Sequence, residues 1–253
     1  MKVSVIQSAL FWENRTANLA MFEEKIADIT DTDLIILPEM FTTGFSMNSA
    51  KLAEPMNLHT SKWMLQMAQA KEAVVTGSII ISEKGHFYNR LLWVRPDGRI
   101  TFYDKKHLFR MGEENNHFSA GTKQLIEEWQ GVRFNLSVCY DLRFPVWLRN
   151  KNCEYDVLIN VANWPDSRAD VWRTLLKARA LENQSYVIGV NRIGEDGRGL
   201  SYAGDSLIVD AKGTIVKDAH QTDGVIDCEL DMDALYSFRE KFPVHKDADF
   251  FKM

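Results

Sequence analysis

The chain has 253 residues, 45% of them hydrophobic and 26% charged, and its 30 basic and 35 acidic side chains leave a net charge of −5. These values are ordinary for a soluble globular protein and provide ample material for a hydrophobic core. They exclude a protein that binds nucleic acid or an anionic membrane through a basic surface. The sequence has no apolar run near the roughly 18 residues that a membrane span requires. We therefore expect a small-molecule partner.

The cysteines and the first residues of the chain predict a cytoplasmic protein. Cys139, Cys153 and Cys228 are an odd number, widely spaced and without a CxxC pair, which fits a reducing compartment better than a disulfide framework. Residues 1–15 have neither the long apolar segment nor the cleavage site of a signal peptide, and their pattern is that of a first strand.

The first part of the chain alternates strands with helices. Residues 2–7 and the fully apolar run 34–37 predict strands, the second of them covered on both faces. Residues 14–29 predict a helix with Thr16 as its N-cap, and residues 60–72 predict another helix.

The following segments add a hairpin, a long loop and more strands. Two apolar runs around the turn EKGH (83–86) predict a β-hairpin, and residues 99–105 predict the next strand. Residues 106–123 lack periodicity and are expected to form a functional loop. Further strands are predicted at 132–138, 155–162, 186–192 and 205–210, with a helix over 168–184 that turns Val171, Leu175 and Ala178 inward.

These elements predict a mixed sheet layered with helices in one α/β domain, because helices alternate with strands while several strands pair through tight turns. The sequence has no Pro/Gly/Ser-rich linker and no repeat of fixed period. We therefore expect residues 1–253 to form a single domain.

Three reactive side chains directly follow predicted strands. Glu39 comes after LIILP, Lys105 after RITFYD and Cys139 after NLSV. Ligands bind beyond the carboxyl ends of strands in layered α/β folds, so the three are candidates for one site. Each also has an ordinary explanation: a turn acid, a solvated charge and a small buried side chain. Together they are the set that acyl transfer needs, namely a base, a positive charge for an oxyanion and a thiol nucleophile.

Four sequence blocks resemble signature segments of the nitrilase superfamily, in the family's order and spacing. The blocks are LPEMFTTGF (37–45), YDKKHLF (103–109), VCYDLRFP (138–145) and RALENQSYV (179–187). The resemblance implies a four-layer αββα sandwich, usually assembled as a homodimer, and a Glu39–Lys105–Cys139 catalytic triad. It selects Lys105 over Lys106, because the family's lysine stands two residues before His107.

The family pattern adds two groups to the expected site. A second active-site glutamate follows the lysine, and MGEENNHF offers Glu113 and Glu114, of which the family spacing favours Glu114. The backbone N–H of Tyr140 is expected to hold the oxyanion together with Lys105. The implied reaction passes through a thioester on Cys139 and uses no cofactor.

Further segments resemble the omega-amidase branch of the superfamily. They are NVANWP (160–165), HLFRM (107–111), YDLRFPVW (140–147) and FPVHKDADFF (242–251). The resemblance implies hydrolysis of the terminal amide of 2-oxoglutaramate and 2-oxosuccinamate. Deaminated glutathione and N-carbamoyl amines are alternative substrates within the superfamily. The non-enzymatic alternative is a catalytically silent interaction module, which predicts loss of a triad residue, and all three are present.

A substrate carboxylate needs a cation in the pocket, and Arg143 and Arg168 are candidates for it. Arg143 also has a structural alternative, an ion pair with Asp141 inside its own loop. Trp164 and Phe118 are candidates for the pocket wall, although aromatic side chains more often lie in a core or an interface.

Other signals predict no additional chemistry. GEDGRG (194–199) matches neither a dinucleotide fingerprint nor a phosphate loop and predicts a flexible hairpin loop. The six histidines show no HxxxH or HExxH spacing, so no metal site is expected. A thiol redox role for Cys139 lacks a resolving cysteine, and Cys153 and Cys228 are expected to be inert.

Overall fold

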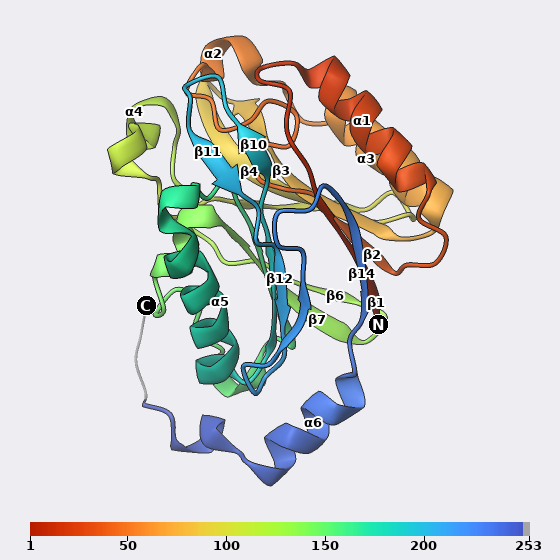
Figure 1. The fold of residues 1–253 in the computed structure, drawn as a ribbon, viewed down its shortest axis with the longest axis vertical. Helices are drawn as coiled ribbons and strands as arrows, with labels where there is room; N and C mark the ends of the chain where they lie inside the picture. The colour runs from red at the N-terminus through yellow and green to blue at the C-terminus, as the bar shows by residue number, and fades with distance from the viewer. Residues whose placement is uncertain (250–253) are drawn as a thin grey trace.

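The computed structural model describes residues 1–249, in which two six-stranded sheets face each other (Figure 1). The strands of the first sheet, in spatial order, are β14 (Gly224–Glu229), β1 (Lys2–Gln7), β2 (Leu34–Ile36), β3 (Val74–Glu83), β4 (His86–Val94) and β5 (Ile100–Asp104). Those of the second are β13 (Ile215–Asp218), β12 (Leu207–Val209), β9 (Tyr186–Val190), β8 (Val157–Val161), β7 (Val132–Val138) and β6 (Ile126–Trp129). A separate hairpin pairs β10 (Ile193–Glu195) with β11 (Ser201–Ala203).

Helices cover the outer faces of both sheets, so the four-layer αββα sandwich is confirmed. Helices α1 and α3 lie against the first sheet, and α5 lies against the second on the opposite side of the molecule (Figure 1). The α-helices are α1 (Arg15–Ala27), α2 (Ser49–Leu52), α3 (His59–Lys71), α4 (Glu114–His117), α5 (Ala169–Asn183) and α6 (Met232–Lys241). The 3₁₀ helices are η1 (Arg110–Gly112), η2 (Cys139–Arg143), η3 (Lys151–Cys153), η4 (Asp166–Arg168) and η5 (Val244–Asp247).

The strand directions bring several chain segments to one edge of the sandwich. Strands β1, β2 and β3 run parallel in the first sheet, as do β7, β8 and β9 in the second. Strand β5 has the direction of β3, because each is antiparallel to β4. Residues that follow β2, β5, β7 and β8 therefore leave the sheets where a layered α/β fold binds its ligands. These residues include Glu39, Lys105, Cys139 and Asn163.

Two packed apolar layers support this edge, one between the two sheets and one between the first sheet and its helices. Between the sheets, the fully buried rings of Trp93 and Phe134 pack with centroids 5.1 Å apart. Between the first sheet and its helices, Phe22 meets Phe41 edge-on at 5.6 Å. Burial of each such side chain contributes roughly 1.5–3 kcal/mol.

The expected N-cap of the first helix is wrong, whereas the expected hairpin is confirmed. Helix α1 begins after Asn14, whose side chain accepts a hydrogen bond from the Ala17 N–H at 3.1 Å, so Asn14 and not Thr16 is the cap. Strands β3 and β4 pair around Lys84 and Gly85, which have φ values of +50° and +79°. Positive φ at both central residues is the geometry of a tight two-residue hairpin turn.

The buried face of α5 lies one residue beyond the predicted one. Val171, Leu175 and Ala178 are only partly buried. The buried positions are Trp172, Leu176, Arg179, Ala180 and Asn183. Arg179 is buried because its guanidinium donates to the Leu142 carbonyl at 2.6 and 3.1 Å, which ties α5 to the turn that carries Cys139. The polar residues Arg179 and Asn183 on this buried face hide the helical periodicity.

Within residues 1–249, no helix combines the length and the hydropathy that a membrane span would need. The expected loop over 106–123 contains the short helices η1 and α4. Of the block 242–251, Phe250 and Phe251 lie outside the described residues.

Candidate active site

Cys139 stands at the end of β7, where the chain enters the 3₁₀ helix η2. Its φ is +46°, in the left-handed region that a non-glycine residue adopts at a cost of about 1–3 kcal/mol. The side chain is buried, with 9% of its surface exposed. The N–H of Tyr140 occupies the second position of η2, where a helix supplies no partner for the donor. A thiol and an N–H available to an oxyanion therefore lie one residue apart.

Asp141 holds this turn through buried hydrogen bonds. Its Oδ2 accepts from the Val138 N–H at 3.1 Å and from the Tyr103 hydroxyl at 2.8 Å. Its Oδ1 accepts from the His107 N–H at 2.9 Å and lies 2.8 Å from His107 Nδ1. These contacts offset the cost of burying the charge. Asp141 is thus paired with His107, and the alternative ion pair with Arg143 is not formed.

The Glu39 carboxylate follows β2 and is completely buried. Its Oε1 accepts hydrogen bonds from Lys105 Nζ and Asn89 Nδ2, both at 2.8 Å. Its Oε2 accepts from the backbone N–H of Asn163 at 2.7 Å. Donors from three different chain segments fix the orientation of this carboxylate.

Lys105 Nζ lies between two buried acids. It is 2.8 Å from Glu39 Oε1 and 2.9 Å from Glu114 Oε2, and all three side chains are 0% exposed. Asn89 Nδ2 bridges the same two acids, with Glu114 Oε1 at 3.2 Å. The neighbouring Glu113 is exposed and precedes α4. The structure therefore places Glu114, and not Glu113, beside the lysine.

Burial and the neighbouring charges set the protonation of this cluster. Burial raises the pKa of the Cys139 thiol well above its ordinary value, the negative charge of Glu39 raises it further, and Lys105 lowers it by less. Burial alone lowers the pKa of Lys105, but the charges of Glu114 and Glu39 outweigh this and raise it. Burial raises the pKa of Glu114 despite the opposing charge of Lys105. The site therefore holds a neutral thiol next to a charged ammonium.

This constellation fits acyl transfer by a thiol. A neutral thiol needs a base to become nucleophilic, and the Glu39 carboxylate lies close enough for its negative charge to act on the thiol. A fixed ammonium and a free backbone N–H are groups that stabilise a tetrahedral oxyanion.

The profile of a family described as Carbon-nitrogen hydrolase matches residues 2–240. The chain belongs to the carbon-nitrogen hydrolase family. The protein is an amidase of the nitrilase superfamily and falls in its omega-amidase branch, as the sequence blocks predicted.

Relatives of this carbon-nitrogen hydrolase match it over most or all of its length. It is 46% identical to the omega-amidase YafV of Escherichia coli K12, over 100% of this chain and 98% of that protein. It is 33% identical to the 2-oxoglutaramate amidase of Bacillus subtilis, over 85% of this chain and 84% of that protein. The crystal structure of XC1258 from Xanthomonas campestris, described as a CN-hydrolase superfamily protein with an arsenic adduct in the active site, is 39% identical. It superposes with a TM-score of 0.98 over 100% of this chain and 98% of that one.

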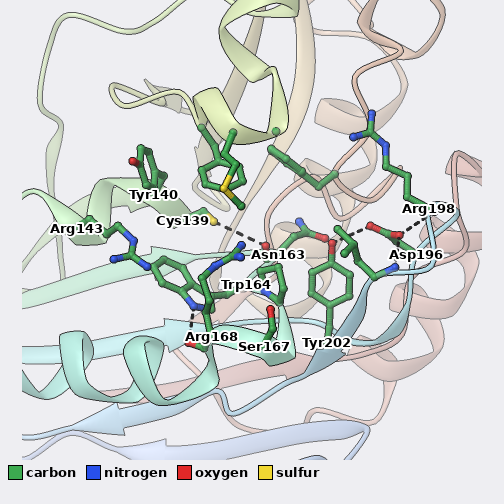
Figure 2. Close-up of a pocket in the computed structure, with 16 residues that line it drawn as sticks. Cys139, Tyr140, Arg143, Asn163, Trp164, Ser167, Arg168, Asp196, Arg198 and Tyr202 are labelled. Carbon is green, nitrogen blue, oxygen red and sulfur yellow. Dashed lines mark hydrogen bonds between the residues drawn. The ribbon is translucent and has the colours of Figure 1, made fainter.

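The Cys139 side chain opens into a pocket of about 210 Å³ (Figure 2). Its wall combines aromatic rings with guanidinium groups and is built by the segments after β2, β5, β7 and β8 and by the β10–β11 hairpin. The lining residues are Phe45, Phe109, Met111, Gly112, Cys139, Tyr140, Arg143, Asn163, Trp164, Pro165, Ser167, Arg168, Asp196, Arg198, Leu200 and Tyr202.

Three arginines surround this pocket: Arg143, Arg168 and Arg198. The guanidinium of Arg143 lies 5.2 Å from the ring centroid of Trp164, and that of Arg168 lies 5.5 Å from the ring of Phe109. Within residues 1–249, none of the three forms an ion pair with a carboxylate. The pocket is therefore positively charged and has room for an anion.

Of the two aromatic residues expected in the pocket wall, the structure places Trp164 at the pocket and Phe118 outside it. Trp164 lines the pocket, and its Nε1–H donates to the Arg168 carbonyl at 2.9 Å. Phe118 packs instead in a separate apolar cluster with Met40 and Ile80. The single turn of α4 directs Phe118 inward, and Phe45 and Phe109 form the wall in its place. 

Sequence reasoning missed four polar parts of the site. Asn89 lies in the middle of β4 and hydrogen-bonds both acids. Asn163 belongs to the quoted block NVANWP, but no role was expected of it. The segment 194–199 does form a hairpin loop, yet it supplies Asp196 and Arg198 to the pocket. The Tyr202 hydroxyl donates to Asp196 Oδ2 at 2.8 Å and holds this loop in shape.

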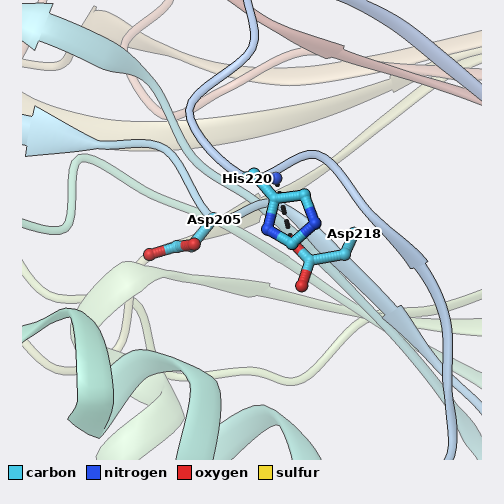
Figure 3. Close-up of side chains that lie close together, drawn as sticks. All are labelled: Asp205, Asp218 and His220. Carbon is cyan, nitrogen blue, oxygen red and sulfur yellow. Dashed lines mark hydrogen bonds and ion pairs between the residues drawn. The ribbon is translucent and has the colours of Figure 1, made fainter.

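The described residues contain one cluster with the composition of a metal site, formed by Asp205, Asp218 and His220 (Figure 3). Arg173 of α5 already binds both carboxylates, at 2.8 Å from Asp205 Oδ1 and 2.6 Å from Asp218 Oδ2. A guanidinium there supplies the positive charge that a cation would bring. The cluster thus fastens α5 to the end of β13 and to the segment before β12.

Proposed function

We propose that this protein is an omega-amidase, which hydrolyses the terminal amide of 2-oxoglutaramate and 2-oxosuccinamate to the 2-oxo acid and ammonia. The observation that carries the proposal is a single pocket that joins the Cys139 thiol to three guanidinium groups, none of which has a carboxylate partner among residues 1–249. A monoamide of a dicarboxylic acid has an amide for the thiol and a carboxylate for a guanidinium. Similarity to the Escherichia coli omega-amidase and the Bacillus subtilis 2-oxoglutaramate amidase supports this substrate class.

In the proposed acylation step, Glu39 takes the thiol proton of Cys139 and the sulfur attacks the amide carbon. Lys105 and the Tyr140 N–H stabilise the resulting oxyanion, and loss of one such donor typically reduces turnover by about 10²–10³. Glu39 then returns its proton to the amide nitrogen, the C–N bond breaks, and ammonia leaves. The acyl group remains on Cys139 as a thioester.

Water completes the proposed cycle. Glu39 removes a proton from a water molecule, which attacks the thioester carbon through a second oxyanion. Collapse of this intermediate breaks the C–S bond, and Cys139 regains its proton from Glu39 as the 2-oxo acid departs. One carboxylate thus serves twice as a base and twice as an acid. Glu114 acts as a positioning residue, because its carboxylate holds the same Lys105 ammonium that Glu39 contacts.

The substrate carboxylate is proposed to bind at the arginines of the pocket. Stacking on Trp164 and Phe109 leaves the N–H edges of Arg143 and Arg168 available for a bidentate contact. Arg198 offers a third guanidinium from the β10–β11 hairpin. For the arginine that binds the carboxylate, substitution with Ala is expected to raise KM more than it lowers kcat, and a matched amide without a carboxylate should be insensitive to the change.

We also propose one domain over residues 1–253 in a cytoplasmic homodimer. The family match over residues 2–240 supports the single domain, and the three unpaired cysteines fit the reducing cytoplasm. Exposed apolar side chains support an interface, because Val146, Leu181 and Phe242 are 57%, 52% and 59% exposed. Two hydrogen bonds join the three chain segments that carry these side chains. One runs from the Arg149 guanidinium to the Glu182 carbonyl and the other from the Gln184 side-chain amide to the Phe242 carbonyl.

Light scattering on the protein and on a Leu181→Asp variant tests this assembly. A dimer that the variant dissociates supports the interface, and a monomer at all concentrations contradicts the dimer. A dimer that Leu181→Asp leaves intact contradicts this surface.

Ammonia release by the purified protein tests the proposed activity. The assay compares 2-oxoglutaramate, 2-oxosuccinamate, deaminated glutathione, an N-carbamoyl amine and free glutamine, with Cys139→Ala in parallel. Release from the two oxo-amides, but not from glutamine and not by the variant, is the expected result. Preference for deaminated glutathione or the carbamoyl amine would leave the proposed Cys139 mechanism in place but contradict the proposed oxo-amide substrates. Release by Cys139→Ala would overturn the nucleophile.

A further inference from the structure

Asn163 carries a buried acceptor atom that the fold leaves without a donor. The residue lines the pocket together with Cys139 (Figure 2) and is 4% exposed. Its side-chain oxygen Oδ1 makes no hydrogen bond within residues 1–249. A buried amide oxygen without a partner is costly, and each such group in a native protein calls for an explanation.

The orientation of this side chain is fixed by Glu39. The Asn163 Nδ2 donates to the Glu39 carbonyl at 2.6 Å, and the Asn163 N–H donates to Glu39 Oε2 at 2.7 Å. Only the NH₂ end of an amide can donate to a carbonyl, so the Nδ2 and Oδ1 positions cannot be exchanged. The backbone oxygen of the same residue accepts from the Cys139 thiol at 3.9 Å. Asn163 is thus held against both the thiol and the carboxylate, with Oδ1 left as an acceptor.

The reacting groups narrow the choice of donor for Oδ1. The oxyanion requires donors and is served by Lys105 and the Tyr140 N–H. The thiol proton goes to Glu39. The amide nitrogen of the substrate, in contrast, carries two N–H groups that none of these residues accepts. We infer that Asn163 Oδ1 accepts one N–H of the substrate amide and keeps this bond as the nitrogen leaves, an inference that rests on the amide hydrolysis proposed above.

Such a bond would aid the step in which the C–N bond breaks. The nitrogen of the tetrahedral intermediate has two N–H groups and one lone pair, and Glu39 must deliver its proton to that lone pair. Anchoring one N–H on Oδ1 directs the lone pair toward Glu39, which Asn163 itself holds. The electrons of the C–N bond pass to the nitrogen, which leaves as ammonia. The acid formed later has no N–H at this end, so its carboxylate oxygens face Oδ1 without a donor and product release is favoured.

A comparison of amide with ester tests this role. The methyl ester that matches 2-oxoglutaramate has the same acyl group and passes through the same thioester, but its leaving oxygen has no N–H. Asn163→Ala is expected to reduce kcat/KM for the amide about 10- to 100-fold more than for the ester, because a substrate N–H then lacks its acceptor.

Asn89→Ala is the matched control. Asn89 is also buried and also donates to the Glu39 carboxylate, but its Oδ1 accepts from the Ser78 hydroxyl at 2.8 Å and it does not line the pocket. Loss of Asn89 should therefore reduce amide and ester turnover by the same factor. Equal losses on both substrates in Asn163→Ala would overturn the inference and leave Asn163 as a positioning residue for Glu39.

A binding measurement covers the case in which Asn163→Ala does not fold. In the Cys139→Ala background, 2-oxoglutaramate should bind about tenfold or more tightly than its methyl ketone isostere, which places a CH₃ where the amide has NH₂. Equal affinities would overturn the inference. Lack of amide hydrolysis by the wild-type protein would instead overturn the proposed function, so the two failures are distinguishable.

Discussion

Glu39 Oε1 and Lys105 Nζ lie 2.8 Å apart, and neither side chain has any exposed surface. Glu114 Oε2 contacts the same ammonium at 2.9 Å. One buried cation therefore compensates two buried acids, which makes Lys105 the electrostatic centre of the site. Removal of one member of such a group leaves uncompensated charge in a medium of low polarity.

Lys105→Met is expected to lose activity and stability together. The substitution leaves two facing carboxylates without a cation, and breaking a buried pair in this way costs about 3–5 kcal/mol. Turnover should fall by at least about 10²–10³, because an oxyanion donor is lost as well. Urea unfolding and ammonia release measure the two effects. A variant with the stability of the wild type would show that Glu39 and Glu114 do not both depend on Lys105 for charge compensation.

Glu39→Gln is expected to make the Cys139 thiol more acidic and the enzyme less active. Burial and then the negative charge of Glu39 raise the pKa of the thiol, so removal of that charge lowers the pKa. Turnover nevertheless falls, by about 10²–10⁴, because the proposed base is gone. Ultraviolet absorbance of the thiolate against pH, with Cys139→Ala as the blank, follows the titration. An unchanged or higher thiol pKa in Glu39→Gln would contradict the effect assigned to the Glu39 charge.

The sequence predicted the layers and the three residues at the strand ends for a physical reason. A strand covered on both faces is a continuous apolar run, so the first polar residue after it is conspicuous. Glu39 stands in such a place after β2, whereas Lys105 follows the partly exposed edge strand β5 and Cys139 follows β7. The strand directions and the packing of the two sheets bring all three to one edge. Resemblance to a known family then selected Glu114 from its neighbour.

The remaining polar residues of the site depend on packing that the sequence does not display. Asn89 is followed directly by Arg90 in β4, so nothing in the strand sequence singles it out, and it reaches Glu39 only through the pairing register of β3 and β4. The β10–β11 loop enters the pocket because its tip rests on Trp12, where an added Cβ on Gly197 would lie 2.4 Å from the indole. Contacts between segments so distant in the chain have no local signal.

Arg239→Met is expected to destabilise the fold without changing the pocket. Arg239 of α6 is 6% exposed, and its Nη1 lies 2.6 Å from the fully buried Asp156. Loss of the guanidinium leaves that buried acid undercompensated, at a cost of about 3–5 kcal/mol. Arg133 pairs with the same carboxylate but its side chain is 38% exposed, so Arg133→Met should cost only ~1 kcal/mol. Denaturant unfolding compares the two variants, and equal losses would contradict this difference between a buried and a screened partner.

Chelators are expected to leave both turnover and Tm unchanged. The described cluster with the composition of a cation site is Asp205, Asp218 and His220, and Arg173 already neutralises its carboxylates (Figure 3). The charge of Arg173, together with the His220 N–H at 2.9 Å, favours the ionised carboxylate and lowers the pKa of Asp218 although burial opposes this. A carboxyl group whose pKa is lower in the folded than in the unfolded protein stabilises the fold at pH values above its unfolded pKa. This stabilisation is lost as the pH falls through the folded pKa. Arg173→Met should therefore have a lower Tm than the wild type at neutral pH. The difference between the two Tm values should become smaller in acid. A wild-type Tm that falls with EDTA and recovers with added metal would contradict this assignment and make the cluster a metal site.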